Sequence, residues 1–182
     1  IFEAMKTYNL PEGRMEVIYD KDFKVIVDFA HTPNALHEAL PSIRDEHIKN
    51  GRLIHIFGAA AFRDDAKRPL MGEESGKYAD LTIITEEDYR TEDPEKIARE
   101  IAVGLERESF TKVDPDELGR KNKTYTSIVN RKEAIEQALD IAKKGDVIVL
   151  TGKGHEQSLC RGTVEYPWND KEAVLEILNK TG

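Results

Sequence analysis

The sequence is short of cysteine, of long apolar runs and of flexible segments. Cys160 is the only cysteine among the 182 residues, so no disulfide can form within the chain. A single thiol is typical of a protein kept in a reducing cytoplasm. No apolar run approaches the roughly 20 residues that a membrane-spanning helix needs, and the first residues lack the pattern of a signal peptide. These absences argue against a membrane protein and favour a cytoplasmic one.

Basic residues are also scarce. Lys and Arg number 27 against 35 Asp and Glu, which gives a net charge of −8. Surfaces that bind nucleic acid are usually basic, so a general nucleic-acid-binding role is not expected. With 39% hydrophobic and 34% charged residues, the chain has the composition of a folded domain. Glycine, proline and serine nowhere cluster enough to mark an internal boundary, and the length suits one domain.

Short apolar runs alternate with amphipathic helical patterns. The runs predict strands at 14–19, 24–28, 53–57, 81–85, 124–129 and 146–150. Helices are predicted between them, with N-caps at Asp93, Asn130 and Asn169, a start at Pro69, and a break or kink at Pro41. This alternation predicts an α/β, three-layer Rossmann-like domain. Its sheet is mostly parallel, with about six strands and an edge strand that can run antiparallel. The segment 106–123 is expected to be a surface excursion.

The segment Thr151–Glu156 (TGKGHE) follows the buried strand predicted at 146–150. Two glycines allow the backbone to approach a ligand, while Lys153 suits an anion and Glu156 an ammonium group. Simple chain reversal explains the glycines equally well. The segment is neither a P-loop nor a dinucleotide fingerprint, because the spacing and the residue after Lys153 are wrong.

Three other loops also follow predicted parallel strands, at 30–33, 58–64 and 86–90. Parallel strands end at the same edge of a sheet, and ligands of open α/β sheets bind there. The four loops and the residues just after them bring cations or potential cations and three anions to this edge: His31, Arg63, Lys67, Arg68, Arg90 and Lys153 with Glu87, Asp88 and Glu156. Both signs of charge together favour a zwitterionic ligand with a phosphate nearby.

Several of these segments resemble motifs of the Mur ligases, the ATP-dependent peptide ligases of peptidoglycan precursor synthesis. The motifs occur in the family's order and span nearly the whole chain: 13–16 (GRME), 27–33 (VDFAHTP), 57–72 with Arg63-Asp64 and KRPLMG, 90–94 (RTEDP) and 152–156 (GKGHE). The segment around His31 also occurs in folylpolyglutamate synthetases. The last motif and KRPLM narrow the resemblance to the C-terminal domain of the MurE type, which adds the third peptide residue.

The resemblance implies a reaction and a domain organisation. ATP activates the carboxylate of a UDP-MurNAc-dipeptide as an acyl phosphate, with Mg²⁺ at the phosphates, and the amine of a free amino acid attacks it. Residues 1–13 are then a linker from a central ATPase domain, and 14–182 are the amino-acid-binding domain. Because the chain has no P-loop, the catalytic groups and the metal site are expected in that central domain. The chain alone is expected to be inactive.

The resemblance also implies roles for individual residues. Arg14, Asp28 and His31 match positions that reach the nucleotide. Arg63, Glu87, Asp88, Arg90, Gly152 and Glu156 match the region that holds the incoming amino acid. Plainer roles compete with these: a strand-end cap for Asp28, a structural histidine for His31, and inter-loop ion pairs or a solvated acidic turn for 86–95. Lys67 and Arg68 can simply be exposed.

The chain departs from the family at the amino-acid site. Members that add diaminopimelate carry Asp-Asn-Pro-Arg where this chain has Glu87-Asp88-Tyr89-Arg90, and alanines replace glycines at 60 and 61. Asp88 adds a negative charge that favours a cationic amine. The resemblance makes diaminopimelate the first expectation, with lysine or ornithine second and a divergent paralogue with another acceptor third. A folylpolyglutamate- or cyanophycin-type ligase, and a free-standing binding module without catalysis, are the alternatives.

Overall fold

The computed structural model describes residues 11–181, so most of the predicted linker lies outside the described residues. Its helices are α2 (Pro33–His47), α3 (Lys67–Tyr78), α4 (Pro94–Arg107), α5 (Arg131–Ile141) and α6 (Asp170–Thr181), with a 3₁₀ turn at Pro115–Glu117. Its strands are β1 (Glu16–Asp20), β2 (Lys24–Val27), β3 (Leu53–Phe57), β4 (Leu81–Ile84), β5 (Thr111–Lys112), β6 (Thr124–Ser127), β7 (Val147–Leu150), β8 (Ser158–Arg161) and β9 (Val164–Pro167). Within this part of the chain no helix combines the length and apolarity needed to cross a bilayer.

Seven strands form the main sheet in the order β1-β2-β7-β3-β4-β6-β5. Only the edge strand β1 runs antiparallel to its neighbour β2, and the other pairs are parallel. Leu150 at the end of β7 lies opposite Val27 of β2 and Ile56 of β3, so these strands end together. The predicted α/β fold with a mostly parallel sheet is confirmed, with one strand more than the six expected.

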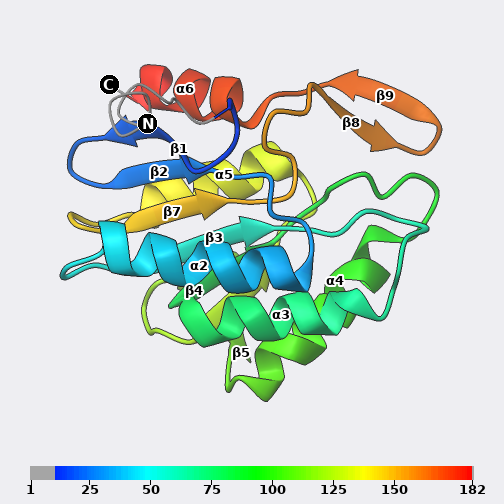
Figure 1. Ribbon diagram of the computed structural model, residues 1–182, viewed down its shortest axis with the longest axis horizontal. Helices are drawn as coiled ribbons and strands as arrows, with labels where there is room; N and C mark the ends of the chain where they lie inside the picture. Colours follow the sequence, from blue (N-terminus) through cyan, green and yellow to red (C-terminus); the bar gives the residue numbers. More distant parts are fainter. Residues whose placement is uncertain (1–10, 182) are drawn as a thin grey trace, which may run out of the picture.

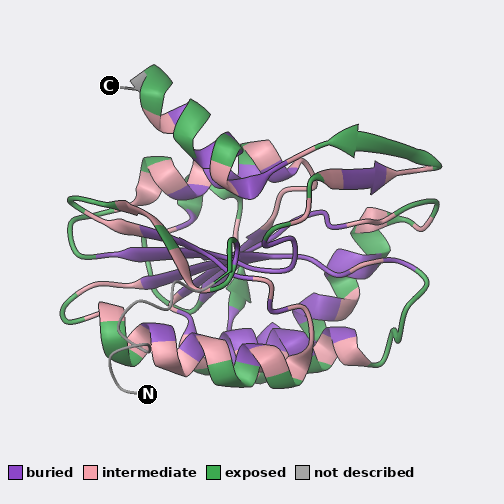
Figure 2. Ribbon diagram, turned by 45° about the horizontal axis from the view of Figure 1, so that its top comes forward, coloured by how far each residue is buried: buried purple, intermediate pink, exposed green. Residues whose placement is uncertain are grey.

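Helices cover both faces of this sheet. One core cluster joins the sheet to α2, α3 and α4, and a second joins it to α5 and α6. The four central strands β2, β3, β4 and β7 are buried almost throughout, which is why their apolar content is continuous rather than alternating. Figure 2 shows this buried centre between two layers whose outer surfaces are exposed. The molecule therefore has the three predicted layers.

Several helix starts follow from local chemistry. Asp93 accepts a hydrogen bond from Glu95 N, Asn130 from Lys132 N and Glu133 N, and Asn169 from Glu172 N. These contacts satisfy backbone donors that the first helical turn leaves without partners. The three predicted N-caps are thus present. Thr32, with Pro33 at the first helical position, caps α2 in the same way.

One prediction about local structure was wrong, namely a break at Pro41. Helix α2 does not break at Pro41 but continues to His47 and buries Leu36, Leu40 and Ile43. As predicted, the segment 106–123 lies mostly at the surface, and it contains β5 and the 3₁₀ turn. In addition, β8 and β9 form a separate antiparallel hairpin that was not expected. Figure 1 places this hairpin at the end of the molecule toward which β3 and β7 point.

Candidate functional site

A cavity of about 470 Å³ opens at the edge where the parallel strands end, here called the carboxyl-edge cavity. It is lined by residues from all four loops of the sequence analysis: Phe29, His31, Thr32, Ala60, Arg63, Asp64, Lys67, Glu87, Asp88, Gly152 and Glu156. Its volume is in the range of small-molecule sites. The structure therefore brings His31, Arg63, Glu87, Asp88, Gly152 and Glu156 together. Arg14, Asp28 and Arg90 are not among its lining residues.

Glu87 and Gly152 lie close together in this cavity. Gly152 has φ +104°, and a Cβ atom there would lie 2.7 Å from Oε2 of Glu87. Only 7% of Glu87 is exposed, and its Oε2 has no hydrogen-bond partner among the described residues. Burial raises the pKa of Glu87, although the charges of Arg131, Lys67, Lys153 and His31 oppose the shift. Oε2 of Glu87 is thus a buried carboxyl oxygen at this cavity whose hydrogen-bonding capacity is unused.

Lys153, the cation of the GKGHE motif, is buried with 1% of its side chain exposed. Its ammonium group donates to Oδ1 of Asp88 at 2.9 Å and lies 2.5 Å from Oε2 of Glu156. Burial by itself would lower the pKa of Lys153, but the two carboxylates raise it overall. Lys153 therefore pairs within the protein. It crosslinks the loops that follow β4 and β7.

The two arginines of the predicted amino-acid site are both exposed. Arg63 lines the carboxyl-edge cavity, whereas Arg90 contacts the hairpin, where its Nη1 lies 3.5 Å from Sγ of Cys160. Among the described residues Arg90 forms no ion pair with Glu87 or Asp88, but Asp88 pairs with Lys153 and Glu86 with Arg161, so this segment does form ion pairs with other loops. Glu86 and Glu87 are buried, so the start of the segment is not a solvated turn.

Phe29 is the centre of the group predicted to reach a nucleotide. The guanidinium of Arg14 lies 5.3 Å from the centre of the Phe29 ring, and the rings of His31 and His155 lie 4.7 and 4.9 Å from it. Sequence reasoning gave Phe29 no role, although it lies inside the VDFAHTP motif. Arg14 is exposed and His31 is half-buried, so both remain able to meet an anion.

Asp28 has a clear structural task. Its Oδ1 accepts from Ala30 N at 2.8 Å, and its Oδ2 accepts from Met15 N at 2.9 Å. Only 8% of the residue is exposed. Asp28 thus joins the turn after β2 to the chain that enters β1, as the strand-end alternative expects. A contact with a nucleotide remains a prediction for this residue.

Two buried arginines hydrogen-bond to the backbone of loops that line the carboxyl-edge cavity. Arg131 makes a bidentate pair with Asp170 and donates to the carbonyl oxygens of Glu86 and Thr151, which directly precede Glu87 and Gly152. Arg68 is also fully buried and bonds to Glu92, Glu100 and the carbonyl oxygen of Ala60. The expectation of an exposed Arg68 was wrong, because α3 and α4 enclose its side chain between them.

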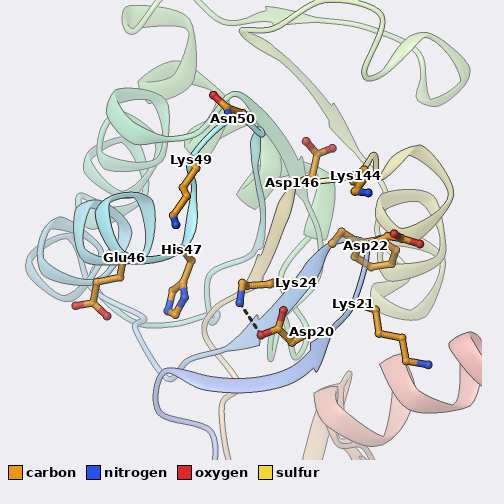
Figure 3. Close-up of a pocket in the computed structure, with 12 residues that line it drawn as sticks. Asp20, Lys21, Asp22, Lys24, Glu46, His47, Lys49, Asn50, Lys144 and Asp146 are labelled. Carbon is orange, nitrogen blue, oxygen red and sulfur yellow. Dashed lines mark hydrogen bonds and ion pairs between the residues drawn. The ribbon is translucent and has the colours of Figure 1, made fainter.

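Figure 3 draws a second cavity, of about 550 Å³, at the opposite edge of the sheet. Its residues lie in the turns before β2 and β7 and after α2: Asp20–Lys24, Glu46–His47, Lys49–Asn50 and Lys144–Asp146. Charges of both signs line it, and Lys24 pairs with Asp20 across 2.6 Å. It is the larger of the two cavities, but it lies where parallel strands begin. Ligands of such sheets bind where the strands end, so the carboxyl-edge cavity is the better candidate.

Comparison with known proteins agrees with this geometry. The family described as Mur ligase, glutamate ligase domain matches residues 13–154. The chain belongs to the Mur ligase family. The match runs from the turn before β1 to Gly154 and so includes every residue that lines the carboxyl-edge cavity except Glu156.

Relatives within the Mur ligase family are consistent with the MurE type. The chain is 40% identical over its whole length to the UDP-N-acetylmuramoyl-L-alanyl-D-glutamate–2,6-diaminopimelate ligase of Aquifex aeolicus, of which it covers 34%. It is 40% identical to the UDP-N-acetylmuramyl-tripeptide synthetase of Roseiflexus sp., over 93% of this chain and 31% of that protein. The predicted resemblance to a MurE-type domain is therefore confirmed. The chain spans about a third of the length of these relatives.

Solved structures support the same fold. A diaminopimelate ligase of this type superimposes with a TM-score of 0.79 at 33% identity, over 97% of this chain and 33% of that one. E. coli FolC in complex with ADP matches with a TM-score of 0.59 at 17% identity, over 95% of this chain and 33% of that chain. At this identity the second match shows a similar fold and nothing about activity. Sequence identity therefore favours the Mur ligases over the folylpolyglutamate alternative.

Proposed function

We propose that this chain binds the incoming amino acid in an ATP-dependent ligase of peptidoglycan precursor synthesis. The ligase joins the third residue to UDP-MurNAc-dipeptide in the bacterial cytoplasm. The observation that carries the proposal is the carboxyl-edge cavity, which is lined both by Arg63, His31 and Lys67 and by Glu87, whose buried Oε2 has no hydrogen-bond partner among the described residues. A free amino acid carries both charges and suits this lining. Diaminopimelate is our first choice, in line with the names of the relatives, and lysine or ornithine the second.

Each side chain has a task in this proposal. Arg63 and Arg90 bind carboxylate groups of the amino acid, since a guanidinium pairs with a carboxylate through two parallel hydrogen bonds. Glu87 accepts hydrogen bonds from an amine, and Glu156 provides a second carboxylate at the same cavity. Gly152 leaves the space that the Glu87 carboxylate occupies. Together these residues orient the amine for attack on an activated carboxyl group.

ATP, when bound, supplies the phosphoryl group that activates the dipeptide carboxylate. Arg14 and His31 fit its phosphates, because they are accessible cationic or potentially cationic groups around the Phe29 ring. Asp28 keeps these groups in place through its two backbone hydrogen bonds and is our candidate for a ribose contact. Among the described residues no group of three or more His, Cys, Asp or Glu could hold a metal ion. We assign Mg²⁺ and the catalytic groups to parts of the ligase outside this chain, because the chain has no P-loop.

The test uses the full-length ligase with ATP, UDP-MurNAc-dipeptide and diaminopimelate, lysine or ornithine in turn. Phosphate release and the mass of the product identify the substrate. Arg90→Ala should raise the KM for the amino acid far more than the KM for ATP. Arg99→Ala, which removes an exposed arginine paired with Asp93, serves as the control. Equal effects of Arg90→Ala on the two KM values would show that Arg90 does not bind the amino acid.

Two further assays address the alternatives. A folylpolyglutamate-type enzyme would add glutamate to a pterin-linked acceptor and leave the muramoyl dipeptide unchanged. A binding module would bind an amino acid without consuming ATP in any combination. We expect the isolated 182-residue chain to form no product, so product from this chain alone would contradict the assignment of catalysis to other domains.

A further inference from the structure

The hairpin of β8 and β9 contacts the loop that carries Glu87, Asp88 and Arg90. The Arg90 N–H donates to the carbonyl oxygen of Cys160 at 3.1 Å, and the Gly162 N–H donates to that of Arg90 at 2.6 Å. Arg90 and Arg161 thereby form an isolated parallel β-bridge. The hairpin thus hydrogen-bonds to both the N–H and the C=O of Arg90, as a neighbouring parallel strand would.

Side chains add to this connection. Oδ1 of Asp88 accepts from the Cys160 N–H at 2.9 Å. Arg161 makes a bidentate pair with Glu86, with Nε 2.8 Å from Oε2 and Nη2 against Oε1. The Glu86 side chain is 1% exposed and that of Arg161 33%. A bidentate pair with one buried member has more geometric specificity than an exposed ion pair.

The backbone of Arg90 needs such support. Its φ is +49°, in the left-handed region that residues other than glycine rarely adopt. Such conformations persist where surrounding contacts determine them. The two backbone hydrogen bonds to the hairpin are contacts of this kind. Figure 2 shows the hairpin with a buried strand, β8, and an exposed strand, β9, and it is β8 that meets the loop.

We propose that the hairpin is a positioning element for the amino-acid site and that Arg161 is its principal positioning residue. Arg161 does not line the carboxyl-edge cavity. It acts by fixing Glu86, and with it the register of Glu87, Asp88 and Arg90 toward the ligand. The inference rests on the proposed function, since that function makes this loop part of the amino-acid site. It assigns the 158–167 segment a role in amino-acid affinity.

The kinetic test compares Arg161→Ala and Arg161→Lys with Arg120→Ala in the full-length ligase. Arg120 forms an exposed pair with Glu117 and is the matched control. Arg161→Ala should raise the amino-acid KM about tenfold, as loss of a hydrogen-bonded ionic contact implies. The KM for ATP should change less than about twofold on the same scale. Arg161→Lys keeps the charge but loses the bidentate geometry, so it should recover part of the effect.

Amide hydrogen exchange supplies a readout that needs no ligand. Protection of the Arg90 and Gly162 N–H groups should fall in Arg161→Ala and remain in Arg120→Ala. If protection falls while the amino-acid KM stays unchanged, the positioning role is wrong. If neither changes, the contact between hairpin and loop does not depend on Arg161, and the inference is also wrong. Should Arg161→Ala fail to fold, the Arg161→Lys variant decides by the same two measurements. Failure of the proposed function itself is recognised separately, by an unchanged amino-acid KM in Arg90→Ala.

Discussion

Replacing Gly152 by alanine tests the geometry of the carboxyl-edge cavity most directly. Two costs arise. At φ +104° an L-residue is strained, by about 1–2 kcal/mol for a left-handed conformation. The new Cβ would also lie 2.7 Å from Oε2 of Glu87, well inside a comfortable contact of about 3.5 Å. Overpacking at a buried position adds about 1–3 kcal/mol. We therefore expect the free energy of unfolding to fall by about 2–5 kcal/mol.

The chain offers a matched control in Gly145. Its φ is +90°, and the nearest atom to a Cβ there would be 3.8 Å away, at an ordinary contact distance. Gly145→Ala should thus show the backbone strain alone. Urea denaturation of both variants gives the difference, which is the cost of the contact with Glu87. In a Glu87→Ala background, Gly152→Ala should cost no more than Gly145→Ala, since its collision partner is gone.

This reasoning also predicts a functional change. Because the Glu87 carboxylate must move to admit the methyl group, the affinity for the amino acid should fall in Gly152→Ala and stay unchanged in Gly145→Ala. Calorimetric titration with diaminopimelate measures both. Equal stability losses for the two glycines, or no relief in the Glu87→Ala background, would show that Glu87 does not occupy the space beside Gly152.

Three other predictions follow from buried polar groups. Burial, with the charge of Arg131, lowers the pKa of His55 from 6.5 to about 3. As the pH falls, the unfolded chain therefore takes up this proton before the folded protein does. The stability that is present above pH 6.5 is then lost as the pH falls toward 3, by at most about 1.4 kcal/mol per pH unit. Urea denaturation at several pH values should show a shallower loss in His55→Gln. Asp28→Ala should lower the free energy of unfolding by about 2–4 kcal/mol, because it removes the acceptor of two backbone N–H groups, whereas Asp20→Ala, which loses an exposed pair with Lys24, should change it little. Asp88→Asn in the full-length ligase should shift the amino-acid preference from lysine toward diaminopimelate, because it removes a negative charge. A competition assay measures the ratio of the two products. An unchanged ratio would contradict a role of Asp88 in this preference and would mean that its pairing with Lys153 already neutralises it.

The parts of the fold that depend on local pattern could be predicted from the sequence. Buried β-branched runs gave the central strands within one or two residues, as at Leu53–Phe57, because their burial on both faces leaves a continuous apolar signal. Helix caps such as Asp93 with Pro94 act within one helical turn, so they too can be recognised from the sequence. The hairpin was missed for the opposite reason. All residues of β9 are exposed, and the apposed strand β8 is held by the loop 86–90, far away in sequence.

The assembly of the site was predictable, but the pairing of its charges was not. Parallel topology alone brings the loops after β2, β3, β4 and β7 to one edge, which is why residues from all four line one cavity. Whether a cation there meets a ligand depends on tertiary contacts. In the sequence Lys153 looks suited to bind an anionic ligand, yet in the structure it forms ion pairs with Asp88 and Glu156. No local signal distinguishes it from the exposed Arg63.

The ligand preference of this edge is therefore set by the charges that remain after the protein has paired its own. Arg131 is matched by Asp170, Lys153 by Asp88 and Glu156, and Arg161 by Glu86. What remains at the cavity is the buried carboxyl oxygen of Glu87, the carboxylate of Asp64 and the basic groups of Arg63, Lys67 and His31. Because two carboxylates meet the single charge of Lys153, one more negative charge is left there. The cavity thus keeps groups of both signs, so an ammonium group can meet Glu87 while a carboxylate meets Arg63. A zwitterionic amino acid matches both, whereas a purely anionic or purely cationic ligand matches only one.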